Sequence, residues 1–146
     1  MKVGKVTFTE AYKAVNEYRQ KFPQKAVTFY AQNYPAMGWA VFMAGGSCPV
    51  IPCTDKAFLK DAAAMEVEET NTDEYKKMVK SDIGSIIYSK SGTEIPVQLS
   101  SGKYVLKYIH PASGKIETIN KSLKINGLYN LKVPDKKEGI YWFHKL

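Results

Sequence analysis

Arginine and cysteine are almost missing from this chain of 146 residues. Arg19 is the only arginine among 21 basic residues, although the guanidinium fork is the group best suited to read guanine and phosphate. Lysine runs are no longer than two residues, so nucleic acid is an unlikely partner despite the net charge of +7. Cys48 and Cys53 are separated by four residues and no histidine pair accompanies them, which excludes a zinc or C-x-x-C site and predicts two reduced thiols.

Long apolar runs are also absent. No stretch of about 18 apolar residues predicts a membrane span, and Met1–Thr7 lacks the apolar core of a signal peptide. As written, the chain is expected in the cytoplasm with no membrane partner. A fragment of a secreted enzyme would instead be periplasmic or extracellular.

The positive charge lies in the second half of the chain. Residues 1–82 carry 11 basic and 10 acidic side chains, a net charge of +1, whereas residues 83–146 carry 10 basic and 4 acidic, a net charge of +6. Lysines on strands commonly protect a sheet edge. A basic domain that binds an acidic partner is the alternative interpretation.

The first half reads as helices with one strand. Thr7-Phe-Thr-Glu10 is a capping box that predicts a helix to about Phe22; its apolar stripe is Ala11, Val15, Tyr18 and Phe22. Residues 25–31 are β-branched and aromatic and predict a buried strand. Residues 35–45 predict an uncharged helix, apolar almost all round and therefore buried, that ends at Gly45-Gly46.

A third helix and a connector follow. Thr54 or Asp55 can cap a helix over residues 56–65, whose inward residues are predicted to be Phe58, Leu59, Ala62 and Met65. Residues 66–82 are rich in Glu and Lys, which predicts a solvated connector with a short helix at 73–80.

From residue 83 the apolar period changes to two. Runs at 85–90, 94–99, 103–110, 115–119, 123–125, 128–133 and 139–144 predict six or seven short antiparallel strands in a β-sandwich. Pro96 marks an edge strand, residues 111–114 a tight turn, and Asn126-Gly127 a hairpin. The expected fold class is α+β: N-terminal helices with one or two strands (residues 1–82) packed on a small antiparallel β-sandwich (residues 83–146).

Several segments together resemble a known family. Lys25-Ala-Val-Thr-Phe-Tyr, Gly38-Trp-Ala-Val-Phe-Met-Ala-Gly-Gly-Ser-Cys-Pro, Phe58-Leu-Lys-Asp-Ala-Ala-Ala-Met and Ile87-Tyr-Ser-Lys are similar to the C-terminal part of a group of bacterial glycoside hydrolases. In that group a (β/α)8 barrel precedes a small β-sandwich. The resemblance covers residues 7–146 and implies that residues 7–65 match the last barrel elements. Most of a barrel, which needs about 200 residues or more, would lie outside this chain.

Catalytic chemistry is not evident in the residues. Glycoside hydrolysis needs two carboxyl groups on either side of the scissile bond, but the acids lie in the 66–74 segment or on helix faces, where Glu10, Glu17 and Asp61 are expected to be solvated. Ser47 is not in a G-x-S-x-G pattern and Gly45-Gly46 is not a P-loop. We therefore expect no cofactor, no metal and no activity of the chain on its own.

Sugar contact is the remaining candidate. Aromatic rings stack on the C–H surfaces of sugars, and the candidates on the predicted strands are Trp142, Tyr104, Tyr108 and His110. Packing in the core explains the same rings, and a turn role explains His110. Trp39, in an apolar helix, is expected to be core.

The leading hypothesis is a non-catalytic C-terminal portion of a glycoside-hydrolase-like protein, with a packing or carbohydrate-contact role. Its partners would be a glycan and a catalytic barrel domain or subunit. The alternatives are a stand-alone carbohydrate-binding module and the basic interaction domain.

Overall fold

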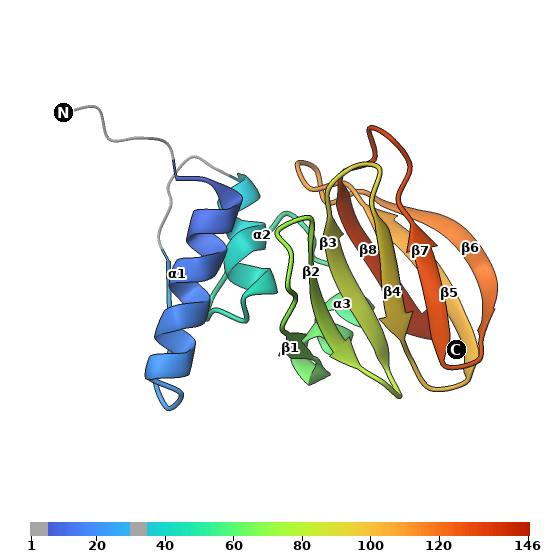
Figure 1. Ribbon diagram of the computed structural model, residues 1–146, viewed down its shortest axis with the longest axis horizontal. Coiled ribbons are helices and arrows are strands. Elements are labelled where there is room, and N and C mark those ends of the chain that lie inside the picture. Colours follow the sequence, from blue (N-terminus) through green and yellow to red (C-terminus); the bar gives the residue numbers. More distant parts are fainter. Residues whose placement is uncertain (1–5, 30–34) are drawn as a thin grey trace. The chain divides into compact units, whose positions relative to one another are not determined.

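The computed structural model describes residues 6–29 and 35–146, which form three helices and eight strands in an α+β fold (Figure 1). The chain divides into two compact units, Met1–Pro52 and Cys53–Leu146. The division therefore falls before residue 53 and not within the 66–82 segment. Cys48 is exposed, Cys53 is buried, and both are free thiols.

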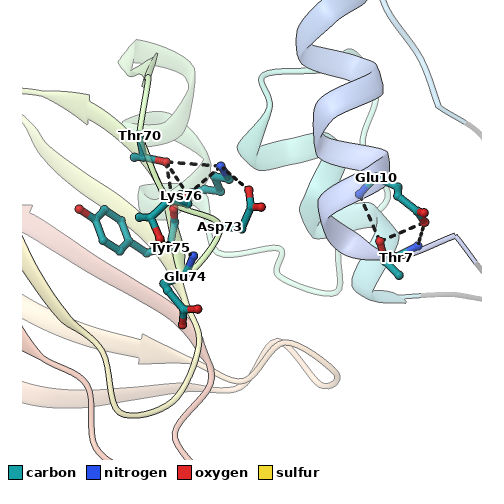
Figure 2. A network of polar contacts seen from close by, with 8 residues as sticks. Thr7, Glu10, Thr70, Asp73, Glu74, Tyr75 and Lys76 are labelled. Carbon is teal, nitrogen blue, oxygen red and sulfur yellow. Dashed lines mark hydrogen bonds and ion pairs between the residues drawn. The ribbon is translucent and has the colours of Figure 1, made fainter.

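Helix α1 (Phe8–Lys21) begins at the predicted capping box. The Thr7 hydroxyl accepts from the Glu10 backbone N–H at 3.2 Å, and the Glu10 carboxylate accepts from the Thr7 N–H at 2.8 Å (Figure 2). These bonds lower the pKa of Glu10. The predicted apolar stripe is only half correct, because Tyr18 and Phe22 are 58% and 38% exposed.

Helix α2 (Pro35–Met43) is buried on all sides that the structure describes, as its composition predicts. Gly45, with a φ of 72°, follows its end, and Arg19 Nη1 donates to the Ala44 carbonyl at 2.9 Å. The strand predicted at 25–31 is wrong over residues 25–29, which are irregular; residues 30 and 31 lie outside the described part.

Helix α3 (Lys56–Ala64) opens the second unit, where the Asp55 carboxylate accepts from the Phe58 N–H at 2.9 Å. Phe58, Ala62 and Met65 are buried as predicted, but Leu59 is 42% exposed. Leu59 points away because it lies about 100° round the helix from Phe58.

Residues 66–80 are not a helical connector. They form β1 (Glu66–Glu68) and β2 (Tyr75–Lys80), an antiparallel pair. The Lys76 side chain, on β2, is buried, and its Nζ donates to the Thr72 carbonyl at 3.0 Å and lies 3.4 Å from Asp73 Oδ1 (Figure 2). A lysine that satisfies a turn in this way favours the hairpin over the predicted helix.

The remaining strands build two antiparallel sheets. The larger has the order β1-β2-β3-β8-β5-β6 and the smaller is the pair β4-β7. Their bounds are β3 (Gly84–Ser89), β4 (Glu94–Gln98), β5 (Gly102–Ile109), β6 (Ile116–Ile125), β7 (Leu128–Lys132) and β8 (Gly139–Lys145). β6 replaces two predicted strands, because register shifts against β5 let one strand continue through residues 120–122.

The Asn126-Gly127 hairpin prediction is wrong. β6 pairs with β5, whereas β7 pairs with β4 in the other sheet. Gly127 has a φ of 94°, which suits a tight change of direction. The turn thus carries the chain from one sheet to the other. β4 has a single neighbour, so Pro96 lies on an edge strand as predicted.

The core of the second unit lies between the two sheets. One buried cluster joins residues of the small sheet, such as Ile95, Val97 and Leu131, to Tyr104, Tyr141 and others of the large sheet. Helix α3 covers the opposite face, where Phe58 makes an edge contact with Trp142 at 5.3 Å between ring centroids (Figure 1). No helix in residues 6–29 and 35–146 has the length and apolar character needed to cross a membrane.

Candidate functional site

The structure buries the aromatic rings that the sequence offered for sugar stacking. Trp142 and Tyr104 have no exposed surface and Tyr108 is 5% exposed. The Tyr104 hydroxyl donates to the Ser100 carbonyl at 2.7 Å, so even its polar end is used internally. Stacking needs an exposed ring face. These three rings provide none, and the core-packing interpretation holds for them.

Only two of the four candidates lie together. The rings of Tyr108 and His110 are in edge contact, with 4.8 Å between their centroids, at the end of β5. Trp142 is opposite Lys107 in the β5–β8 pair, so it points to the other face of the large sheet from Tyr108. His110 follows β5 and its side chain is 35% exposed. Of the four candidates, only His110 has a partly exposed side chain that a ligand could reach.

His110 lies beside a small charged cluster. Its Nε2 is 3.1 Å from Glu117 Oε1, an ion-pair distance for a protonated imidazole, although the geometry is not that of a well-directed hydrogen bond. The contact with His110 lowers the pKa of Glu117, and the nearby charges of Lys137 and Lys115, at 3.7 and 3.8 Å, act in the same direction. Glu117 therefore stays ionised.

Three tyrosine hydroxyls anchor the loop that precedes β8. Tyr108 donates to the Glu138 carbonyl at 2.7 Å, Tyr141 donates to the Lys137 carbonyl at 2.8 Å, and Tyr88 donates to the Glu138 carboxylate. Burial raises the pKa of all three phenols, that of Tyr141 to about 12. At neutral pH they are fixed hydrogen-bond donors, so this end of the sheet is held rigidly.

A second polar cluster was not foreseen from the sequence. Asp61 was expected to be solvated but is only 6% exposed. Its Oδ2 accepts from Trp142 Nε1 at 2.9 Å and lies 2.7 Å from His144 Nδ1. The signal was present, because Asp61 lies three residues after Phe58 and therefore on the buried face of α3.

The contact with Asp61 fixes the orientation of the His144 ring. The ring contacts Asp61 through Nδ1, so Nε2, on the other side of the imidazole, points away from the carboxylate. His144 is 33% exposed at its side chain. Carboxylate–histidine pairs of this kind orient catalytic bases in hydrolases, but no hydroxyl or thiol of the described residues is hydrogen-bonded to His144. The pair therefore lacks a nucleophile within the described structure.

The first unit has an apolar groove of about 360 Å³. It is lined by α1 and the segment after it, and includes Tyr18 and Phe22. Their rings stack at 6.3 Å, and Lys21 and Lys25 place their Nζ atoms 5.6 and 5.5 Å from the Phe22 ring centre. Tyr18 on α1 and Phe22 at its C-terminal cap are the exposed aromatic side chains of this region. Among the described residues no group of three potential metal ligands occurs.

The chain is similar to one family model and to solved structures of larger proteins. A family model described as "Domain of unknown function (DUF6298)" matches residues 1–65, and no curated protein matches the chain. A solved glycoside hydrolase is 15% identical with a TM-score of 0.41, covering 54% of this chain and 19% of its own length.

Two solved structures of CapF are also similar. A complex with 3-isopropenyl-tropolone is 11% identical, covering 94% of this chain and 44% of its own, with a TM-score of 0.23. CapF of Staphylococcus aureus, a capsular polysaccharide assembling protein, is 12% identical, covering 98% and 56%, with a TM-score of 0.18. The chain spans from about a fifth to just over half the length of these proteins, and at these scores the likeness does not establish a common fold.

Proposed function

We propose that the chain is a non-catalytic accessory region of a larger carbohydrate-active protein. Its role is to pack against a catalytic body and to contact glycan. The observation that carries the proposal is the state of the carboxylates in the two polar clusters. Asp61 is committed to Trp142 and His144, and Glu117 to His110 and two lysines.

A glycosidase needs a carboxyl group that has a raised pKa and is open to a substrate, which these clusters do not provide. Its general acid must hold a proton near neutral pH, so its pKa is raised, usually by an apolar pocket. The pKa of Glu117 is lowered instead. Asp61 Oδ2 is already bound by Trp142 and His144, and its side chain is buried, so this carboxyl group is not open to a substrate.

The packing role is supported by the groove of the first unit. Exposed aromatic side chains in an apolar groove are typical of a surface that contacts another polypeptide. Tyr18 and Phe22 are such residues. The sequence resemblance to the C-terminal region of glycoside hydrolases supports a barrel domain as the proposed partner.

The test combines a reaction with a binding assay. The purified chain is incubated with plant and microbial glycans, and release of reducing ends is measured. Affinity electrophoresis on the same glycans measures contact. We expect no hydrolysis and retention on at least one glycan. Hydrolysis that Asp61→Asn or Glu117→Gln abolishes, in variants whose circular dichroism matches the parent, would overturn the proposal.

A further inference from the structure

One side of the large sheet carries three lysines near its β6 edge. We call Lys103, Lys107 and Lys124 the lysine face. Lys103 on β5 is directly opposite Lys124 on β6, and residues directly opposite in an antiparallel pair point to the same side. Lys107 is four residues further along β5 on that side, roughly 13 Å from Lys103. Lys103 and Lys124 are exposed.

The strands place no carboxylate on this side of the sheet. The acids on the strands of the large sheet face the other side, as their register partners show; they are Glu66 (opposite Val79), Glu68 (opposite Lys77) and Glu117 (opposite Tyr108). Helix α3 brings Asp61 to this side, but that carboxylate is buried and bound. Tyr88 also holds the Glu138 carboxylate on this side. Within residues 6–29 and 35–146, neither Lys103 nor Lys124 lies within ion-pair distance of a carboxylate.

Edge protection does not account for these charges. A lysine on an edge strand prevents pairing with another sheet, which explains Lys124 because β6 ends the large sheet. Lys103 and Lys107 lie on β5, an interior strand between β8 and β6. Like charges directly opposite each other destabilise a sheet. An anionic ligand would relieve the repulsion between Lys103 and Lys124.

The surroundings indicate which anion fits. Nucleic-acid surfaces combine basic residues, often arginine, with exposed aromatic rings on which bases stack. The face contains no arginine, and the one ring beside it, Trp142, is buried with Lys107 Nζ 4.6 Å above its centre. Thr118, which is exposed and directly opposite Lys107, adds a hydroxyl suited to sugar hydroxyls. A chain of anionic sugars needs point charges and hydrogen bonds and no stacking platform.

We infer that the lysine face binds an acidic polysaccharide, with Lys103 and Lys124 contacting carboxylates of neighbouring uronic acid units. The inference rests on the proposed carbohydrate-contact role and narrows its ligand class to anionic glycans. The glycan would be held by ionic contacts and not by aromatic stacking, because the candidate rings are buried.

Affinity electrophoresis and calorimetry with polygalacturonate test the inference. Neutral dextran and a single-stranded DNA of equal charge serve as comparison ligands. The test variant is Lys103→Gln/Lys124→Gln. The control is Lys132→Gln/Lys136→Gln, which removes the same charge from exposed positions on and after β7 in the same unit. All four substitutions leave the buried cluster untouched, and circular dichroism checks the fold.

Polygalacturonate is expected to bind at low salt and to weaken as salt rises. The test variant should lose about tenfold in affinity, equivalent to about 1.4 kcal/mol, since it removes two exposed ion pairs with the ligand, and the control should lose less than about threefold. Equal losses in both variants, or DNA binding as tight as polygalacturonate, would overturn the inference. Retention of dextran without polygalacturonate would also overturn it while leaving the proposed function intact, whereas carboxylate-dependent hydrolysis would overturn the proposed function itself.

Discussion

Asp61→Ala is expected to destabilise the second unit by about 2 to 4 kcal/mol. The change removes the acceptor of two hydrogen bonds. Trp142 is completely buried, so its indole N–H stays unsatisfied at a cost of about 1–3 kcal/mol. His144 is 33% exposed and can turn to water, which limits its share to about 1 kcal/mol.

Urea unfolding followed by tryptophan fluorescence measures this loss. Trp39 belongs to the first unit, so parent and variant both carry Trp39→Phe, and Trp142 then reports on the second unit alone. With a urea dependence of about 1.5 kcal/mol per M, the midpoint should fall by about 2 M. Lys60→Ala, at an exposed position on the same helix, is the matched control and should change stability by less than about 0.5 kcal/mol.

Asp61 and His144 should also contribute to stability in a coupled way. In a double-mutant cycle, Asp61→Ala and His144→Ala should be non-additive by about 0.5 kcal/mol or more, since the two side chains share a contact. If Asp61→Ala behaves like Lys60→Ala, the buried carboxylate does not hold the indole, and the assignment of this cluster is refuted.

Three further predictions concern single positions. Tyr141, whose pKa burial raises from 10 to about 12, stabilises the fold fully below pH 10 and loses that contribution as pH rises to about 12; Tyr141→Phe should flatten this alkaline decline in stability, and an unchanged curve contradicts it. Gly139→Ala places a Cβ 2.7 Å from the Tyr108 ring and should cost about 1–3 kcal/mol in thermal unfolding; an unchanged melting temperature contradicts this. Thr7→Ala should cost α1 about 1 kcal/mol by circular dichroism, whereas Thr7→Ser should not.

Local signals in the sequence predicted local structure well. The capping box at Thr7, the burial of α2 and the β-branched and aromatic runs that give β3, β5 and β8 all depend on residues within one element. Each is decided by propensity and period, which short windows contain. The α+β class followed from them.

Long-range pairing was harder to predict. Asn126-Gly127 has the composition of a hairpin, yet its flanking strands belong to different sheets, because β7 finds a better partner in β4. Residues 73–80 carry charges that suit a helix, but pairing with β3 makes residues 75–80 a strand. In the candidate site, Asp61 was missed because its partners are 81 and 83 residues away.

The crossing at Asn126-Gly127 also orders the folding of the second unit. Because Glu94 pairs with Lys132 across the whole β5–β6 hairpin, the small sheet closes a long loop and must form late. A two-stranded sheet has little stability of its own, so β4 and β7 should open before the large sheet does. Such an opening would expose the buried cluster around Ile95 and Leu131. Aggregation of this unit would therefore begin with the separation of β4 and β7 from the large sheet.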